Sequence, residues 1–313
     1  MSEKLVSVIM SVYNEKEEWL RKSIESILKQ TYKSLQFIIV LDNPDNKLAK
    51  TILEEYKLKD SRLICLYNSS NKGLVWSLNN ALNYVKGDYI ARMDADDISS
   101  ENRIMEEMKI MQDNNVDFVT ASIQLIDESE VYITKSQYKD INALKFNKIM
   151  KFGNISTHPT WLVKRTVYEN LLGYREVKYC EDVDFVIRAI QKGFKCYRTE
   201  KILLQYRIRG AGISKSFSIE QDLKARYLRR LYRKGNLIEE QDVADINNKF
   251  FGSSSNKQYT DAIIATERIS INLTKKKYKN TIRIFLKEII SNNIFRRNFI
   301  ENAICYLLLK YYL

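Results

Sequence analysis

The 313-residue chain has few of the residues that usually build phosphate loops and zinc sites. It contains 9 glycines, 4 cysteines and 1 histidine. The cysteines at 65, 180, 196 and 305 lie far apart and form no CxxC or CxH spacing. Structural zinc and a disulfide framework are therefore not expected, and scattered thiols are typical of a reducing compartment.

Long hydrophobic runs are also missing. No run approaches the roughly 18 apolar residues that a membrane span requires. The N-terminal MSEKLVSVIM has neither the basic segment nor the cleavage site of a signal peptide. Hydrophobic residues make up 45% of the chain and charged residues 29%, which is typical of a packed protein with a wet surface. We therefore expect a cytoplasmic protein, either free or held at the inner face of the cell membrane.

Positive charge is concentrated near the end of the chain. The formal net charge is +12, and the stretch from Lys215 onward carries 19 Lys and Arg against 10 Asp and Glu. A basic tail of this kind indicates an anionic partner, such as nucleic acid or the inner leaflet of a membrane. A solvated basic face is the alternative explanation.

Apolar, β-branched runs predict a series of strands that are buried on both faces. The runs are LVSVIMSV, QFIIVL, RLICLY, DYIARM and DFVTAS. Segments with helical spacing separate them, and Asn14 is predicted to cap the first helix. Strands that alternate with helices of about 10–15 residues are typical of parallel βαβ units. The first half is therefore predicted to be a Rossmann-like α/β domain.

Polar clusters follow four of these strands. They read YNE, LDN, NSSNKG and DADD in chain order. Ligands of open α/β sheets bind outside the carboxyl ends of the strands. The four clusters are therefore expected to converge on one crevice.

The usual phosphate-binding motifs are absent from that crevice. The first turn is SVYNEKEE, which has no glycine, and neither GxGxxG nor a Walker sequence occurs in the chain. Three aspartates, Asp94, Asp96 and Asp97, instead crowd one strand end, where like charges repel. Such a cluster suits a divalent cation, because Mg²⁺ and Mn²⁺ bind carboxylate oxygens together with substrate phosphates.

Six segments in order resemble the family 2 glycosyltransferases. They are SVIMSVYNE, IIVLDN, NKGLVWSLNNAL, GDYIARMDADDIS, HPTWLVKRTVYENLLGYRE and CEDVDFVIRAIQKGFK. The resemblance runs from about Val6 to about Ser214 and implies a GT-A fold with a mainly parallel central sheet flanked by helices. It implies a nucleotide-sugar half at about 1–125 and an acceptor half at about 126–214. Residues 215–313 are predicted to form a basic, mainly α-helical region.

The resemblance also implies an activity. The expected reaction is metal-dependent, inverting transfer of a sugar from a nucleotide-diphosphate sugar, with UDP the expected nucleotide, to a glycan or lipid-linked acceptor. Bacterial surface polysaccharide assembly is the expected setting. The alternatives are a non-catalytic nucleotide-binding protein of the same fold, and a nucleic-acid-binding protein that acts through the basic tail. No motif encodes the donor sugar, the acceptor or the linkage.

Donor-side roles carry over from the family's motifs residue by residue. Asp96 is the expected ligand of Mn²⁺ or Mg²⁺, and Asp94 either shares the metal or approaches the ribose. Asp97 either belongs to this cluster or caps the next helix. In relatives a histidine often stands where this chain has Arg209, so Arg209 is expected to contact the diphosphate and not the metal.

The nucleotide is expected to lie among the first three polar loops. Tyr13 would stack on the base, or else it is a core aromatic. Glu15 and Asp42 would bind base and ribose edges. Only Asp42 remains of the family's Asp-Asp-Gly-Ser segment, because this chain reads LDNP. Gly73 serves either a close backbone approach or a tight turn.

The acceptor side is expected to contain the catalytic base. Asp182 matches the family's base, with Glu181 beside it, and its alternative role is a helix N-cap. A helix N-terminus would lower the pKa of Asp182, whereas an apolar acceptor pocket would raise it. His158 either faces the acceptor or is a packed, hydrogen-bonded residue. Trp161 either stacks on a sugar or fills the core.

The last hundred residues combine basic runs with apolar and aromatic faces, as in KKKYKNTIRIFLKEII. Such helices bind membrane interfaces, or they dock on the catalytic domain or on a partner. Membrane-surface association is the preferred interpretation. No recognised nucleic-acid module accompanies the segment.

Overall fold

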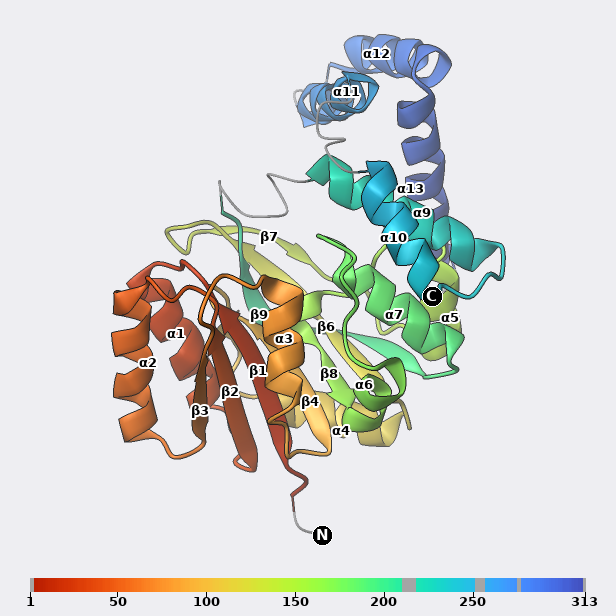
Figure 1. The fold of residues 1–313 in the computed structure, drawn as a ribbon. Coiled ribbons are helices and arrows are strands. Elements are labelled where there is room, and N and C mark those ends of the chain that lie inside the picture. Colours follow the sequence, from red (N-terminus) through yellow and green to blue (C-terminus); the bar gives the residue numbers. More distant parts are fainter. Residues whose placement is uncertain (1–2, 210–217, 251–256, 275–276, 312–313) are drawn as a thin grey trace.

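The computed structural model describes residues 3–209, 218–250, 257–274 and 277–311. A nine-stranded sheet runs in the order β3-β2-β1-β4-β8-β6-β9-β5, and β7 pairs with β6 (Figure 1). The strands are β1 (Val6–Val12), β2 (Leu35–Leu41), β3 (Leu63–Tyr67), β4 (Tyr89–Asp94), β5 (Ile98–Ser99), β6 (Phe118–Ile126), β7 (Tyr132–Ser136), β8 (Leu162–Lys164) and β9 (Cys196–Arg207).

Helices connect and cover these strands. In the first 200 residues they are α1 (Glu17–Leu28), α2 (Lys47–Lys59), α3 (Leu74–Leu82), α4 (Arg103–Asp113), α5 (Ala143–Ile149), the short 3₁₀ helix η1 (His158–Thr160), α6 (Arg165–Leu171) and α7 (Glu181–Gln191). The C-terminal region contains α9 (Ser218–Arg233), α10 (Glu240–Phe250), α11 (Lys257–Thr274), α12 (Tyr278–Ser291) and α13 (Asn293–Tyr311).

The predicted parallel sheet is present in the first half of the chain. β1 pairs in parallel with β2 and β4, and β2 pairs in parallel with β3. The register sets Ser11 beside Asp94 and Val12 beside Leu41. The loops after β1, β2 and β4 therefore leave the sheet at one edge, which is where the polar clusters were expected to converge.

The second half adds antiparallel pairs to this frame. β8 pairs antiparallel with both β4 and β6, and it joins the two halves of the sheet. β6 then runs parallel to β9, while β5 and β7 add antiparallel edges. The predicted α/β class with flanking helices is confirmed.

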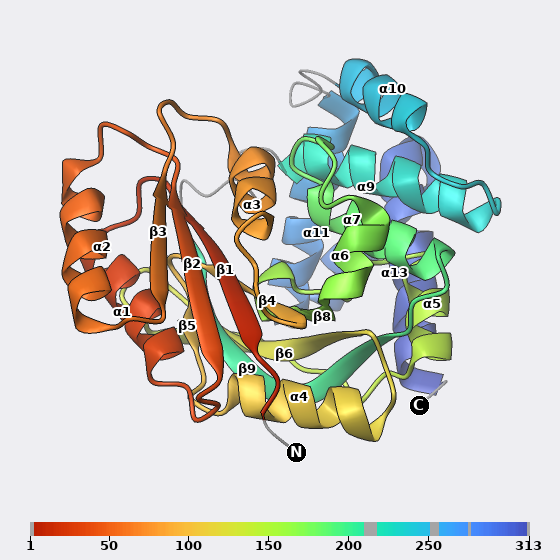
Figure 2. The ribbon, with the colours of Figure 1, turned by 60° about the horizontal axis from the view of Figure 1, so that its bottom comes forward.

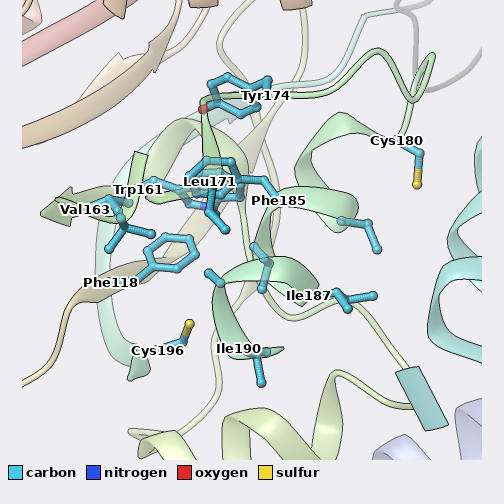
Figure 3. Packing of buried hydrophobic residues seen from close by; sticks show 14 of the residues in the cluster. Phe118, Trp161, Val163, Leu171, Tyr174, Cys180, Phe185, Ile187, Ile190 and Cys196 are labelled. Atoms are coloured by element: carbon cyan, nitrogen blue, oxygen red, sulfur yellow. The ribbon is translucent and has the colours of Figure 1, made fainter. Parts of the chain in front are cut away.

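The sheet is buried on both faces, which explains its unbroken apolar runs. One cluster of buried side chains packs α1, α2 and α4 against the sheet, and a second packs α3, α5, α6 and α7 against the other face (Figure 2). Phe118, Trp161, Tyr174 and Phe185 lie together in the second cluster (Figure 3). The Trp161 ring centroid is 4.7 Å from that of Phe118 and 5.5 Å from that of Phe185.

The C-terminal helices divide into two groups. α9, α10 and the end of α13 contribute Ala225, Leu228, Ile246 and Leu309 to the second core cluster. α11, α12 and the start of α13 form a small separate cluster around Phe295. Part of the basic region therefore docks on the α/β domain. None of the helices within the described ranges is both long enough and apolar enough to cross a membrane.

Local helix starts differ from the expectation at one point. α1 begins at Glu17, and the residue before it, Lys16, makes no side-chain capping bond. The prediction that Asn14 caps this helix is therefore wrong. In α2 the cap is a side chain, since Asn46 accepts a hydrogen bond from the Ala49 backbone N–H at 2.9 Å.

Candidate active site

A cavity of about 820 Å³ opens beyond the carboxyl ends of the parallel strands. It is lined by residues from the loops at this edge of the sheet and from the start of α7, and by Arg209, which follows β9. Seven of the predicted site residues line it: Gly73, Asp94, Asp96, His158, Glu181, Asp182 and Arg209. The fold therefore brings the DADD cluster and the predicted acceptor-side residues to one space, whereas no residue of the YNE or LDN cluster lines it.

Asp94 ends β4 and contacts a buried arginine. One of its carboxylate oxygens is ion-paired with Nη1 of Arg92, a side chain that is 1% exposed. The Asp94 backbone carbonyl accepts a hydrogen bond from the Ser23 hydroxyl at 2.7 Å. β4 and α1 thus hold this aspartate at the edge of the cavity.

Asp96 contacts a second arginine. Nε of Arg209 lies 2.8 Å from Oδ2 of Asp96, and Nη1 of Arg209 lies 3.9 Å from Oε1 of Glu15. Burial, together with the charge of Asp94, raises the pKa of Asp96 to about 7. In this structure the positive groups at the aspartate cluster are therefore arginines.

Asp97 has a structural role, because its Oδ1 accepts a hydrogen bond from the Arg207 backbone N–H at 2.8 Å and the side chain is buried. The next helix, α4, is preceded by Asn102. The alternative that Asp97 caps this helix is therefore wrong. Burial raises the pKa of Asp97 well above its usual range.

Three predicted nucleotide residues lie outside the lining of this cavity. Tyr13 is 46% exposed, so the alternative that it fills the core is wrong. Glu15 accepts a hydrogen bond from the Tyr13 backbone N–H at 2.8 Å, and burial raises the pKa of Glu15. Asp42 is buried and accepts hydrogen bonds from the Lys72 and Gly73 backbone N–H groups, both at 2.8 Å. Asp42 thus holds the loop before α3 in place.

Gly73 is required for its backbone conformation. Its φ is +89°, in the region that side chains disfavour, and an added Cβ would meet no heavy atom within 4 Å. The structure therefore favours the tight turn over a close approach of protein backbone at this position.

Asp182 and Glu181 lie in the first turn of α7, and Cys180 precedes the helix. The alternative that Asp182 is a plain N-cap is therefore wrong. Nδ2 of Asn154 lies 3.4 Å from Oδ2 of Asp182. Burial raises the pKa of Asp182 despite its backbone hydrogen bonds, so the effect of burial outweighs that of the helix terminus. Burial and the charge of Asp182 raise the pKa of Glu181 to about 8.

His158 is both a packed residue and part of the cavity lining. Its Nε2 lies 2.9 Å from the Tyr174 hydroxyl, and its ring centroid is 4.4 Å from that of Trp161. Burial and the charge of Arg92 lower the pKa of His158 well below its usual range, so the ring is neutral at pH 7. Asn79 supports this group by exchanging two hydrogen bonds, each 2.9 Å long, with the Tyr174 backbone.

Trp161 fills the core. It is 0% exposed, and its ring packs among Phe118, Tyr174 and Phe185 (Figure 3). The prediction of an acceptor-side role is wrong for this residue, because no face of the ring is open to a sugar.

Arg92 is a site residue that the sequence prediction missed. It lines the cavity, and its Nε and Nη1 make no hydrogen bond within the described residues, although Nη1 is ion-paired with Asp94. Its charge also acts on Glu181 and Asp182, where it favours the ionised carboxylates and partly offsets the rise in their pKa values that burial causes. The available signal was an arginine inside the otherwise apolar strand YIARM, since a charge is buried only with a partner or a function.

The residues that could hold a cation are carboxylates. Glu15, Asp94 and Asp96 offer the hard oxygen ligands that Mg²⁺ and Mn²⁺ prefer. Over the described ranges, no group of three or more His, Cys, Asp or Glu side chains forms a ready metal cage. A cation here would therefore need oxygens from a bound phosphate to complete its coordination.

Comparison with known proteins identifies the family. The profile described as "Glycosyl transferase family 2" matches residues 7–172. An uncharacterised glycosyltransferase of Methanocaldococcus jannaschii, MJ1057, is 39% identical over 66% of this chain and 72% of its own length. The O-antigen biosynthesis glycosyltransferase WbnJ of Escherichia coli is 31% identical over 74% of this chain and 90% of its own length.

A further relative and a solved structure agree with this match. WfaP of Escherichia coli, described as a UDP-Glc:alpha-D-GlcNAc-diphosphoundecaprenol beta-1,3-glucosyltransferase, is 29% identical over 67% of this chain and 80% of its own. The crystal structure of Staphylococcus aureus TarS 1-349 with UDP has the same fold, with a TM-score of 0.59 at 17% identity over 81% of this chain and 74% of that one. The chain belongs to glycosyltransferase family 2 and is a glycosyltransferase of GT-A fold.

Proposed function

We propose that this enzyme transfers a sugar from a UDP-sugar to a lipid-linked glycan acceptor at the cytoplasmic face of the cell membrane, during bacterial surface polysaccharide assembly. The observation that carries the proposal is one cavity lined by Asp94 and Asp96 on one side and by Glu181 and Asp182 on the other. The named substrates of WfaP and the UDP bound to TarS support the donor and acceptor classes.

The donor side fits a divalent cation. Burial and the charge of Asp94 raise the pKa of Asp96, so the site disfavours the ionised carboxylate, and a bound cation would stabilise it. Asp96 and Asp94 would hold Mn²⁺ or Mg²⁺, which when bound stabilises the charge of the leaving diphosphate. Arg209, released from Asp96, would then contact the diphosphate directly. Arg209 thus takes no metal-ligand role.

The nucleotide would lie beside the cavity along the first loops. Tyr13 offers an exposed ring for stacking on the base, and Glu15 lies next to it. Asp42 reaches the nucleotide either directly or through the loop to Gly73 that it holds. The residues proposed to bind or position the nucleotide are therefore Tyr13, Glu15, Asp42 and Gly73.

Asp182 is the proposed general base. Its carboxylate would take the proton of the acceptor hydroxyl as that oxygen bonds to the anomeric carbon and the bond from this carbon to the diphosphate oxygen breaks. A single carboxylate acting opposite the leaving group inverts the anomeric configuration. A pKa raised by burial makes Asp182 a stronger base than an exposed aspartate.

Calorimetric titration of UDP tests the donor site. Binding is expected in Mn²⁺, and it should weaken at least about tenfold in EDTA, because the diphosphate then meets an acidic cluster alone. Asp96→Asn should remove the difference between Mn²⁺ and EDTA, whereas Asp88→Asn, at an exposed aspartate that precedes β4 at the end opposite Asp94, should not. Equal binding with and without metal would refute the metal role. If the protein bound GDP or dTDP but not UDP, the assignment of UDP as the donor's nucleotide would be wrong.

A further inference from the structure

The outer face of α12 exposes a row of large apolar side chains. Tyr278, Ile282, Leu286 and Ile290 recur every fourth residue and are 59%, 57%, 52% and 75% exposed. No residue of α12 is buried. Side chains four apart lie on one side of a helix, so the four form a continuous strip. Below, this strip is called the α12 row.

Basic side chains run beside the α12 row. Lys279, Arg283 and Lys287 each follow one of its members by one position, and all three are exposed. Within the described part of the chain, no carboxylate lies within ion-pair distance of any of them. The outer face of α12 therefore combines apolar surface with basic side chains that form no ion pair.

Packing of the inner face of α12 fixes which of its side chains point outward. Ile284, Phe285 and Ile289 pack against the small cluster of Ala262, Ala265 and Phe295 from α11 and α13. The Phe285 ring centroid lies 6.1 Å from that of Phe295. Because this side of the helix is already occupied, the α12 row cannot turn inward to bury itself.

We propose that the α12 row and its three basic neighbours dock on an anionic membrane surface. Apolar side chains would enter the headgroup boundary, while Lys279, Arg283 and Lys287 would contact lipid phosphates. The docking surface is independent of the donor and of the base assigned above.

Two other occupants fit the surface less well. A second copy that packed the same face against itself would bring each basic row close to its like-charged counterpart. Nucleic acid would match the basic row, but its phosphate backbone would leave the apolar row without a partner. An anionic lipid surface matches both rows at once.

The position of α12 suits an enzyme that works at a membrane. In Figure 1, α12 lies at the opposite end of the molecule from the start of β1, and the parallel strands run toward that end. The cavity opens beyond the carboxyl ends of the same strands. A membrane that contacts α12 would therefore lie at the end of the molecule where the site is found.

Vesicle flotation of the full chain tests the proposal. The protein should float with phosphatidylcholine vesicles that contain about 30% phosphatidylglycerol, and it should stay unbound with phosphatidylcholine alone. The triple variant Ile282→Ser, Leu286→Ser, Ile290→Ser should bind at least about tenfold more weakly. The double variant Arg283→Gln, Lys287→Gln should lose about fivefold per side chain, and wild-type binding should fall at about 0.5 M NaCl.

The control is a matched apolar deletion elsewhere. Leu58→Ser with Leu144→Ser removes two side chains that are 88% and 76% exposed, and it should leave flotation unchanged. UDP binding by both α12 variants should equal that of the wild type, which separates this proposal from the donor site. Wild type that fails to float, or that floats equally with both vesicle types, would overturn it. So would a wild-type dimer that the triple variant abolishes without any effect on vesicles.

Discussion

Two acidic pairs face the same cavity, but their surroundings differ. Asp94 and Asp96 are each ion-paired with an arginine, Arg92 and Arg209 respectively. Glu181 and Asp182 form no ion pair within 4.0 Å to any side chain of the described residues, and the side chain that hydrogen-bonds to Asp182 is the uncharged Asn154 amide at 3.4 Å. Four chemically similar residues are therefore placed in two different electrostatic settings.

The difference matches the proposed division between donor binding and proton transfer. Arg209, whose side chain is 31% exposed, could leave Asp96 when another cation binds there, which would suit the proposed donor side. A carboxyl pair that is buried without a paired cation has raised pKa values, and one member is ready to accept a proton. The predictions below test this contrast, beginning with the largest expected effect.

Replacing the proposed base, Asp182, should lower turnover strongly and leave donor binding unchanged. Asp182→Asn is expected to lower kcat about 10²–10⁴-fold, because the acceptor proton then has no base. UDP binding by calorimetry should stay unchanged, since the proposed role of Asp182 is toward the acceptor. Full activity in Asp182→Asn would contradict the assignment. A non-catalytic nucleotide-binding protein would instead show no turnover in either form.

The pH dependence of activity should show where Asp182 and Glu181 titrate. A base must be ionised, and burial raises the pKa of Asp182, so activity should fall about tenfold per pH unit below a midpoint that is higher than that of an exposed aspartate. The wild-type kcat/KM should show a second inflection near pH 8 from Glu181. Glu181→Gln should remove only this second inflection. If the Glu181→Gln profile were identical to that of the wild type, the second inflection would not come from Glu181.

Removing the charge of Arg209 should change ligand binding at Asp94 and Asp96 and leave Glu181 and Asp182 unaffected. Arg209→Gln is expected to weaken UDP binding in Mn²⁺ by about tenfold, the usual effect of losing a charged hydrogen bond. Mn²⁺ binding without nucleotide should strengthen, because Asp96 no longer has a competing partner. Arg165→Gln, at an arginine whose side chain is 40% exposed and paired with Glu169, is the matched control. If Arg209→Gln weakened both ligands, Arg209 would be shown to support the metal site instead.

The smallest expected effect is on stability, at the contact between Asn79 of α3 and the backbone at Gly173 and Tyr174. Gly173 has a φ of +76°, and an added Cβ would lie 2.5 Å from Oδ1 of Asn79, which binds the Tyr174 backbone. Gly173→Ala should therefore lower the free energy of unfolding by about 2–3 kcal/mol in urea titrations. Gly193→Ala has a similar φ of +86° but open space around it, so about 1 kcal/mol is expected. Equal losses would show that the Asn79 contact contributes nothing.

Most of the fold could be predicted because its signals are local. Strands buried on both faces need continuous apolar runs, so VSVIMSV and LQFIIVL were recognisable before their partners were known. The convergence of polar loops followed from the rule for parallel sheets. The antiparallel insertion of β8 did not, because a three-residue strand has too little pattern to show its direction.

The site could be predicted only in part, because the same residue type serves burial and binding. Tyr13 and Trp161 are both aromatic, yet one is 46% exposed and the other 0%. The sequence does not state which side of a turn faces the cavity. Arg92 was missed because its role depends on Asp94, Glu181 and Asp182 lying around it in space.

The sequence by itself determined the family, the alternation of strands and helices, and the aspartates at the end of β4, since each depends on neighbours along the chain. Only the tertiary structure decided which carboxylates have arginine partners, which aromatic ring is buried and which face of α12 is exposed. The physical reason is that burial and Coulomb interactions depend on distances in space. Arg209 and Asp96 are more than a hundred residues apart in the chain, and their side chains lie 2.8 Å apart.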